Sequence, residues 1–239
     1  MLQVLYIIYQ YLIALPIFIV LTILTAVVTM AAIPWKNAEW LHKLQQFWAR
    51  SFCRLLFLPV EVEGLENIQP KTSYVFVSNH QSMTDVFVIY GWLPVIFKWI
   101  MKKELRKVPL VGAACKAAGH IYIDRSNKMA SMRSIAEAER IVTDGVCVVI
   151  FPEGTRTLTG EVGRFKRGAF SIATDLHLPI VPISLSGCYE VMPRTRFYAK
   201  WHRVKMTVGK PIDVSAYPEE DRNVLIEDVR QIVVNNIQS

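Results

Sequence analysis

The stretch YVFVSNHQSMTD, residues 74–85, joins a run of β-forming residues to a short polar turn. Residues 74–78 have the length and the Val and Phe content of a buried strand. The apolar residues that follow the turn predict a helix near 83–92. A strand that passes directly into a helix is typical of an α/β unit, and open α/β sheets bind ligands where their strands end.

The rest of the chain repeats this alternation. Short β-forming runs predict strands at 120–124, 146–151, 180–184 and 204–208, and helices are expected near 110–118, 128–143, 167–176 and from Pro218 onward. Alternating elements predict an α/β fold with a largely parallel sheet and helices on both faces. Because no linker interrupts residues 59–239, we interpret them as one domain.

Composition narrows the class of protein. The chain has 239 residues, of which 52% are hydrophobic, and a formal net charge of +7. It is too apolar for a disordered chain and too mixed for a polytopic membrane protein. A positive charge combined with a high apolar content indicates contact with an anionic membrane surface, or with an acidic ligand or partner.

Residues 1–35 contain no charged side chain, since Lys36 is the first. This run exceeds the ~20 helical residues that cross a bilayer, so it predicts a retained anchor that spans or re-enters one leaflet, with a kink at Pro16. A cleaved signal peptide is the alternative. The absence of a basic amino-terminal region and the length of the run disfavour it.

Residues 37–57 form an amphipathic pattern with a basic stripe and two tryptophans, Trp40 and Trp48. This predicts an interfacial helix, with an ordinary core-facing helix as the alternative. The expected organisation is therefore a membrane motif over 1–58 followed by the α/β domain. If residues 1–33 span the bilayer, the Lys/Arg excess after them places the domain in the cytoplasm. Four cysteines without a Cys-x-x-Cys pair fit a reducing compartment.

The turn after the first strand contains His80 and, five residues later, Asp85. Asp85 can accept a hydrogen bond from one imidazole nitrogen and leave the other free to take a proton from a hydroxyl. The alternative is a helix start at which Asp85 serves only the helix dipole and His80 packs.

Two further segments carry cationic side chains near strand ends. FPEGTR, residues 151–156, places the planar fork of Arg156 on a tight turn, where it can bind an oxyanion such as phosphate. GHIYIDR, residues 119–125, ends in an Asp-Arg pair that predicts either an ion pair or a phosphate contact. The basic cluster that contains Lys102 and Lys103 is either a solvated face or a binding surface.

Together with VPIS at 181–184, these segments resemble the four ordered motifs of the glycerolipid acyltransferase family, most closely the 1-acyl-glycerol-3-phosphate acyltransferases. The resemblance covers roughly residues 60–210. It implies that His80 is the general base and Asp85 its partner. It also implies that the substrate's glycerol phosphate is bound by Glu153, Gly154, Thr155, Arg156, Arg125 and, less directly, Lys102 and Lys103. The apolar amino terminus resembles the two-helix membrane motif of bacterial members.

The resemblance implies an enzyme that moves a fatty acyl group from acyl-ACP (acyl carrier protein) or acyl-CoA to the sn-2 hydroxyl of 1-acyl-glycerol-3-phosphate, forming phosphatidate. No cofactor or metal is expected, since the sequence has no cluster with metal-ligand spacing and no Gly-x-Ser-x-Gly. The expected partners are the membrane lipid surface, lysophosphatidate and the thioester donor, with no nucleic acid. The expected location is the cytoplasmic membrane, with the site on the cytoplasmic side. The alternatives are acylation of another lysolipid, such as a lyso-ornithine lipid or lysophospholipid, and a non-catalytic lipid-binding protein.

Overall fold

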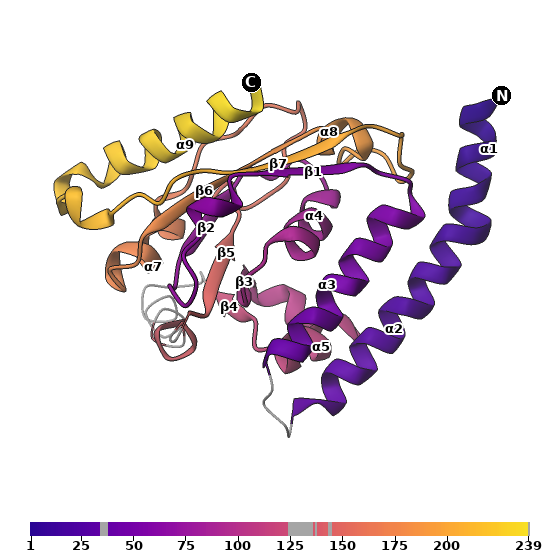
Figure 1. The fold of residues 1–239 in the computed structure, drawn as a ribbon, viewed down its shortest axis with the longest axis horizontal. Coiled ribbons are helices and arrows are strands. Elements are labelled where there is room, and N and C mark those ends of the chain that lie inside the picture. Colours follow the sequence, from indigo (N-terminus) through magenta and orange to yellow (C-terminus); the bar gives the residue numbers. More distant parts are fainter. Residues whose placement is uncertain (34–37, 124–135, 137, 143–144, 239) are drawn as a thin grey trace.

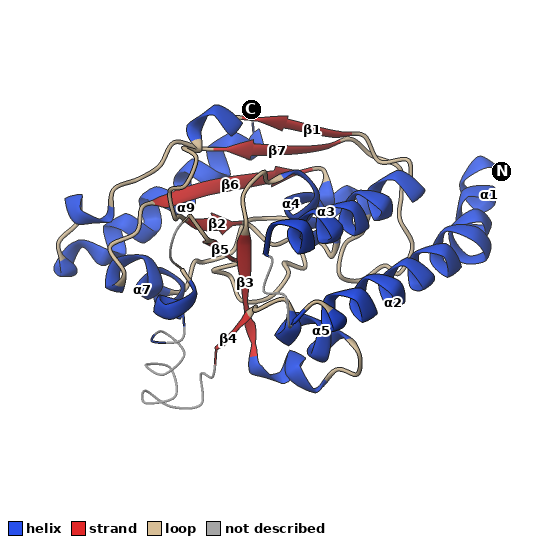
Figure 2. Ribbon diagram, turned by 60° about the horizontal axis from the view of Figure 1, so that its bottom comes forward, coloured by secondary structure: helices blue, strands red, loops and turns tan. Residues whose placement is uncertain are grey.

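A seven-stranded sheet forms the centre of the computed structural model, which describes residues 1–33, 38–123, 136, 138–142 and 145–238 (Figures 1 and 2). The strand order is β1-β7-β6-β2-β5-β3-β4. Strands β6, β2, β5, β3 and β4 are parallel, whereas β7 is antiparallel to β6 and pairs in parallel with β1. The strands are β1 Val60–Glu63, β2 Val75–Ser78, β3 Phe97–Lys102, β4 Ile121–Ile123, β5 Cys147–Ile150, β6 Ile180–Ser186 and β7 Val204–Val208. The predicted, largely parallel sheet is confirmed.

Helices cover both faces of the sheet (Figure 1). One face carries α3 and α4, with α2 and α5 beyond them, and the other carries α7 and α9. The α-helices are α1 Leu2–Tyr9, α2 Leu15–Ala31, α3 Ala38–Leu55, α4 Thr84–Trp92, α5 Val111–Ala117, α7 Arg167–Asp175, α8 Cys188–Val191 and α9 Arg222–Gln238. A π-helical segment, η1 Gln10–Ala14, joins α1 to α2. The 3₁₀ turns are η3 Leu65–Asn67, η4 Lys103–Lys107, η5 Val214–Ala216 and η6 Glu219–Asp221.

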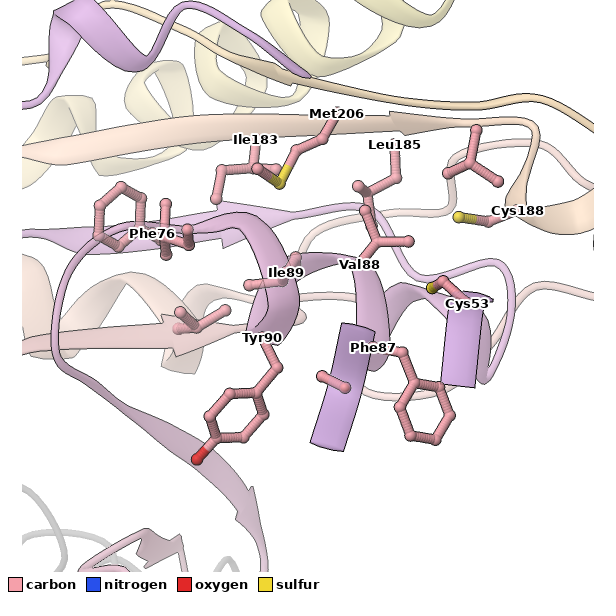
Figure 3. Packing of buried hydrophobic residues seen from close by; sticks show 14 of the residues in the cluster. Cys53, Phe76, Phe87, Val88, Ile89, Tyr90, Ile183, Leu185, Cys188 and Met206 are labelled. Atoms are coloured by element: carbon pink, nitrogen blue, oxygen red, sulfur yellow. The ribbon is translucent and has the colours of Figure 1, made fainter. Parts of the chain in front are cut away.

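Strand β2 is buried on both sides, and its residues alternate between the two cores. Phe76 belongs to the cluster under α3 and α4, while Val75 and Val77 belong to the cluster under α7 and α9. Figure 3 shows the first of these clusters, with Phe76 and Ile183 of the sheet near Ile89 of α4. This two-sided burial explains why residues 74–78 read as a continuous apolar run rather than an alternating one.

The five predicted strands are all present, but β1 and β3 are strands that the sequence analysis missed. Strand β1 lies at the sheet edge and alternates Val with Glu, so its apolar content is low. Strand β3 ends in Lys102, and together with Lys98 this made its sequence resemble a basic cluster rather than a strand. The helix predicted over 128–143 lies largely outside the described residues.

The amino-terminal segment is one continuous helical run, Leu2–Ala31, which is long and apolar enough to cross a membrane by length and composition. It bends at η1, which lies two to six residues before Pro16 in the first turn of α2 (Figure 1). A proline ring clashes with the carbonyl four residues earlier, and a π-helical turn is a common way to accommodate such a disruption.

This helical run lies along the α/β domain and contacts it near both ends. The Tyr6 hydroxyl donates to the carbonyl of Leu56 at 2.6 Å, and Trp48 Nε1 donates to Thr22 Oγ1 at 2.9 Å. Between these contacts, the Gln10 side chain is buried and exchanges two hydrogen bonds with the backbone of Ala199, at 2.9 and 2.7 Å. The run therefore does not project from the domain as a free stalk.

Helix α3 packs against α4, so much of its surface fits the core-facing alternative. Trp48, which we expected at the headgroup level, instead has its ring against Phe18 of α2 and Phe87 of α4, at centroid distances of 5.6 and 5.1 Å. Arg50 Nε donates to the carbonyl of Gly91. Phe47, on the outer side, remains exposed.

Two buried histidines lie between α3 and the β3–β4 edge of the sheet. The His42 ring packs on Phe97 and Tyr90, and His120, just before β4, accepts from the backbone N–H of Trp99. Burial, reinforced by the charge of Lys98, lowers the pKa of His42 to about 4 and that of His120 to about 3. Both imidazoles are therefore neutral in the folded protein at neutral pH.

We expect the free energy of unfolding to fall as the pH drops from about 6.5 toward 4, since the unfolded histidines take up protons that the folded ones do not. In this window each histidine lowers the free energy of unfolding by about 1.4 kcal/mol for each unit by which the pH falls. Above pH 6.5 none of this free energy is lost. Denaturant unfolding in detergent at a series of pH values measures the slope. His42→Phe should reduce the slope and the exposed-site control His177→Gln should not; equal slopes in all three proteins would contradict the assignment.

Candidate active site

The turn after β2 is fixed to the neighbouring strand β6 by a buried asparagine. Asn79 Nδ2 donates to the carbonyl of Leu185, and its Oδ1 accepts from the backbone N–H of the same residue, both at 2.9 Å. The side chain thus continues the strand pairing beyond Ser78, where β2 itself ends. The next residue, His80, leaves the sheet edge from a rigid base.

His80 and Asp85 form the pair that the sequence predicts. Nδ1 of His80 lies 2.8 Å from Oδ2 of Asp85. The same carboxylate oxygen also accepts the backbone N–H groups of Gln81 and Ser82, at 2.6 and 2.8 Å. Because Oδ2 of this buried side chain acts as the acceptor for both backbone N–H groups, we assign the hydrogen in the contact with His80 to Nδ1. The Nε2 atom of His80 is then the basic nitrogen.

Glu153 holds the backbone of the same turn from the loop after β5. Its Oε1 accepts the N–H of His80 at 2.7 Å, and its Oε2 accepts the N–H of Gly163 at 2.9 Å. The residue is only 6% exposed, and burial raises the pKa of its carboxyl while the two N–H donors oppose that rise. A Cβ atom at Gly163 would lie 2.8 Å from Oε2, so this close approach requires glycine.

The loop over 153–163 is bonded to the His80 turn at further points. The N–H of Thr157 donates to the carbonyl of His80 at 3.0 Å, and Gln81 Nε2 donates to the carbonyl of Gly160 at 2.6 Å. Both backbone polar groups of His80 therefore pair with this loop. The first and third motifs of the sequence analysis form one structural unit.

An aromatic ring orients the imidazole. The ring of Phe151 stacks on that of His80, with the centroids 3.9 Å apart and an interplanar angle of 10°. Trp99 stacks on Phe151 in turn, at a centroid distance of 5.4 Å. Together with the bond to Asp85, this stacking restricts rotation of the His80 side chain.

His80 lies on the wall of a pocket of about 570 Å³. Most of the wall is apolar and comes from α4, β3 and α5, including Val86, Met101 and Val111. A second part of the wall comes from the amino-terminal helix, with Thr22, Thr25, Ala26 and Thr29. A pocket of this size and lining can hold an apolar chain.

Three cationic side chains line the same pocket: Lys102 at the end of β3, Arg156 from the third motif and Arg194 from the loop after α8. Arg194 Nη1 donates to Thr155 Oγ1 at 3.2 Å. Of the acidic residues in the described ranges, none forms an ion pair with either guanidinium. The pocket therefore combines an apolar body with an excess of positive charge beside the histidine.

Sequence reasoning missed Arg194 because it lies 38 positions after Arg156 and outside the recognised motifs. The structure brings it to the site through Ser82. Ser82 Oγ donates to the carbonyl of Met192 at 2.6 Å, and Ser82 pairs with Pro193 in a β-bridge. The basic run RTR at 194–196 is the signal that could have drawn attention to this loop.

Of the other predicted site residues, some line the pocket and some do not. Gly154 and Thr155 line the pocket next to Arg156, whereas Glu153 points away from it into the backbone contacts described above. Lys103 begins η4 and is not among the pocket-lining residues. Arg125 lies outside the described residues.

Three hydrogen-bonded polar side chains, Gln45, Tyr90 and His120, form one part of the pocket wall. The Tyr90 hydroxyl donates to Gln45 Oε1 at 2.8 Å and lies 3.2 Å from His120 Nε2. Since His120 Nδ1 accepts from Trp99, its Nε2 carries the proton and donates to Tyr90. His120 is thus a neutral, hydrogen-bonded wall residue. Within the parts of the chain that the structure describes, no group of three His, Cys, Asp or Glu side chains is arranged to hold a metal ion.

Comparisons with known proteins agree with this geometry. A family model for acyltransferases matches residues 59–186. The chain is 31% identical over 225 residues to a 1-acyl-sn-glycerol-3-phosphate acyltransferase of Cocos nucifera, covering 91% of this chain and 71% of that protein. The crystal structure of the 1-acyl-sn-glycerophosphate acyltransferase PlsC from Thermotoga maritima is similar, with a TM-score of 0.80 at 26% identity, covering 98% of this chain and 95% of that one.

Some relatives are longer than this chain. The 1-acyl-sn-glycerol-3-phosphate acyltransferase of Limnanthes alba is 31% identical over 181 residues, which is 75% of this chain and 64% of that protein. The alpha form from Mus musculus is 35% identical over 173 residues, covering 72% and 61%. The chain therefore spans less than two thirds of the full length of these two relatives.

The double hydrogen bonding of Glu153 makes Glu153→Gln destabilising despite its similar shape. A glutamine offers one acceptor oxygen, so one buried N–H, of His80 or of Gly163, loses its partner at a cost of about 1–3 kcal/mol. Denaturant unfolding measures this difference, with the exposed Glu161→Gln as control. An unchanged free energy of unfolding in Glu153→Gln would contradict the positioning role.

Proposed function

This chain belongs to the acyltransferase family, and we propose that it transfers a fatty acyl group from an acyl thioester to the sn-2 hydroxyl of 1-acyl-glycerol-3-phosphate, forming phosphatidate. The observation that carries the proposal is the convergence of a His–Asp pair and two guanidinium groups, neither of which pairs with a carboxylate of the described residues, on one apolar pocket. A lysophosphatidate has the matching parts: a hydroxyl, a phosphate and an acyl chain.

In the proposed reaction, His80 Nε2 removes the proton from the acceptor hydroxyl as the oxygen attacks the thioester carbonyl. The bond from Nδ1 to Asp85 holds the required tautomer and stabilises the imidazolium that forms. The thiolate then leaves as the new ester forms. Thiols have a pKa of ~8.5, so the leaving group needs little help from an acid, and the step needs no cofactor.

The phosphate of the acceptor would be bound by Arg156 and Arg194, with Lys102 nearby on the pocket wall. Guanidinium groups suit phosphate because they offer parallel donors in a fixed plane. The bond from Arg194 to Thr155 and the bridge from Ser82 to Pro193 support this geometry, since they tie the cations to the His80 turn. Fixing the phosphate fixes the hydroxyl and reduces the entropic cost of bringing it to His80.

We further propose that the protein acts at the cytoplasmic membrane, on its cytoplasmic side, with acyl-ACP or acyl-CoA as donor. The exposed apolar residues of Leu2–Ala31 support membrane attachment. Because this helix lies along the domain, attachment within one leaflet accounts for its contacts better than a free span. The four cysteines, which are free thiols in the structure, support a reducing compartment.

The proposed base predicts a large loss of turnover in His80→Ala and in Asp85→Asn. General-base catalysis contributes about 10²–10⁴-fold, so kcat should fall by that range while the KM values change little. A radiolabelled acyl-transfer assay in detergent, with lysophosphatidate and both thioester donors, measures this. His177→Gln is the matched control, and near wild-type turnover in His80→Ala would remove His80 from catalysis.

The proposed phosphate site predicts a selective effect of Arg156→Ala and Arg194→Ala. Hydrogen bonds to charged groups contribute about 1.5–3 kcal/mol, so the KM for lysophosphatidate should rise by about 10–100-fold. The KM for the thioester should not change. Steady-state kinetics with each substrate varied in turn measures both constants.

A monoacylglycerol acceptor, which lacks the phosphate, separates this explanation from misfolding. The two arginine variants should acylate it as well as the wild type does, if slowly. An equal loss on both acceptors would show that the arginines are structural. A wild-type preference for a lyso-ornithine lipid or a lysophospholipid over lysophosphatidate would favour the alternative acceptors.

A further inference from the structure

A basic segment with exposed aromatic residues follows the family motifs. Residues 191–212 contain six Lys or Arg and no Asp or Glu. Some of these cations have partners, since Arg196 bonds to backbone carbonyls and Lys205 pairs with Glu63. Lys200 and Arg203 are exposed. Neither of these two side chains forms an ion pair with a residue that the structure describes, so the segment presents positive charge at the surface.

Large aromatic side chains are exposed in the same region. Phe197 is 87% exposed, Trp201 57% and Phe57 61%. Trp201 Nε1 donates to the carbonyl of Phe57 at 2.9 Å, which joins the two surface segments. Exposed Arg54 lies one helical turn before Phe57. We call Arg54, Phe57, Phe197, Lys200, Trp201 and Arg203 the aromatic–basic patch.

The backbone at Phe57 supports a functional reason for this exposure. Phe57 follows the end of α3 with a φ of 51°, in the left-handed region that favours glycine. The N–H of Leu58 bonds to the carbonyl of Cys53, so this is a Schellman-type helix end. A phenylalanine here carries a conformational cost and gains little burial, although its ring lies 5.4 Å from that of Tyr9.

The patch is continuous with the amino-terminal helical run. Gln10 exchanges two hydrogen bonds with Ala199, and the Tyr11 hydroxyl donates to the carbonyl of Phe197 at 3.3 Å. Leu12 and Ile13, next to these anchors, are exposed. The apolar surface of the helical run and the aromatic–basic patch are thus adjacent, and hydrogen bonds join the two segments.

We propose that the aromatic–basic patch binds the headgroup region of a bilayer that contains anionic lipid. Phe57, Phe197 and Trp201 would enter the interface, where aromatic rings are favoured. Arg54, Lys200 and Arg203 would face the lipid phosphates, each strengthening binding by about fivefold when close to the surface. An acidic protein such as the acyl carrier protein would match the charges but would leave the apolar helix beside it uncovered.

Binding at this patch would set the orientation of the whole protein. The patch lies beside Gln10, whereas the pocket is lined by Thr22–Thr29 further along the same helical run. Fifteen residues of helix, from Gln10 to Thr25, span about 22 Å. Two points of contact this far apart would keep the helix close to parallel with the membrane surface and hold the pocket wall at the lipid.

The first experiment places Trp201 relative to the lipid without needing catalysis. The full-length protein and Trp201→Phe are reconstituted into vesicles of phosphatidylcholine and phosphatidylglycerol, with or without lipids brominated near the headgroup. The difference between the two emission spectra reports Trp201, and bromination should quench it. If the difference signal is insensitive to bromination while other tryptophans are quenched, the patch faces away from the lipid and the proposal is wrong.

The second experiment tests the charges. Lys200→Gln/Arg203→Gln should weaken the quenching of Trp201 in vesicles with phosphatidylglycerol and bring it to the level seen with phosphatidylcholine alone. Arg167→Gln, on the opposite face, is the matched control. An equal response of both variants would overturn the electrostatic part of the proposal.

Two further readouts identify other occupants. Phe197→Ser/Trp201→Ser should slow acyl transfer several-fold on vesicle substrate and leave it unchanged on detergent-dispersed substrate, with Val224→Ser as control. If acyl transfer is lost only with acyl-ACP as donor, and is lost in detergent as well, the patch binds the acyl carrier protein instead. A change in oligomeric state would assign it to a second copy of the chain. Because the fluorescence result does not depend on turnover, it stands even if the proposed acceptor is wrong.

Discussion

The site depends on two buried carboxylates that accept backbone N–H groups from a single turn. Asp85 accepts from Gln81 and Ser82 within the turn, and Glu153 accepts from His80 across the sheet edge. Burying a carboxylate is costly, and hydrogen bonds to Oδ2 of Asp85 and to both oxygens of Glu153 offset part of that cost where these donors converge. The cost therefore favours one conformation of the turn. His80 receives its position from this constraint rather than from packing alone.

This constraint also explains which parts of the site the sequence could predict. His80 and Asp85 lie within one turn, so spacing and strand-end position suggested the pair, and the family resemblance implied their roles. The role of Glu153 was not predictable, because it depends on β2 and β5 being adjacent strands. Arg194 was missed because a β-bridge to the His80 turn brings it in from a distant loop. Periodicity found five of the seven strands and failed for two. Strand β1 is a four-residue edge strand that is half Glu, and the lysines of β3 made it resemble the basic segment that follows it.

The pocket wall has a cationic part and an apolar part, which match the two parts of an anionic amphiphile. Cations and His80 lie together on its wall, while Val86, Met101 and Val111 supply apolar surface. Gln45, Tyr90 and His120 form another polar group, but they are hydrogen-bonded to one another and His120 also accepts from the backbone of Trp99. A satisfied polar group in a pocket wall does not attract charge, and burial keeps His120 neutral by lowering its pKa to about 3. The Lys102, Arg156 and Arg194 side chains are therefore the groups that can compensate an anionic substrate.

The amino-terminal helix gives the site its relation to the lipid phase. Thr22, Thr25 and Thr29 form part of the pocket wall, while other sides of the same helical run expose Leu, Ile and Val. One helix thus separates the pocket from the apolar surface that would meet a bilayer. A lysolipid entering from the leaflet, as proposed, would pass beside this helix without its acyl chain crossing water. A helix that projected freely from the domain could not form such a wall, so its contacts through Tyr6, Gln10 and Thr22 bear directly on substrate access.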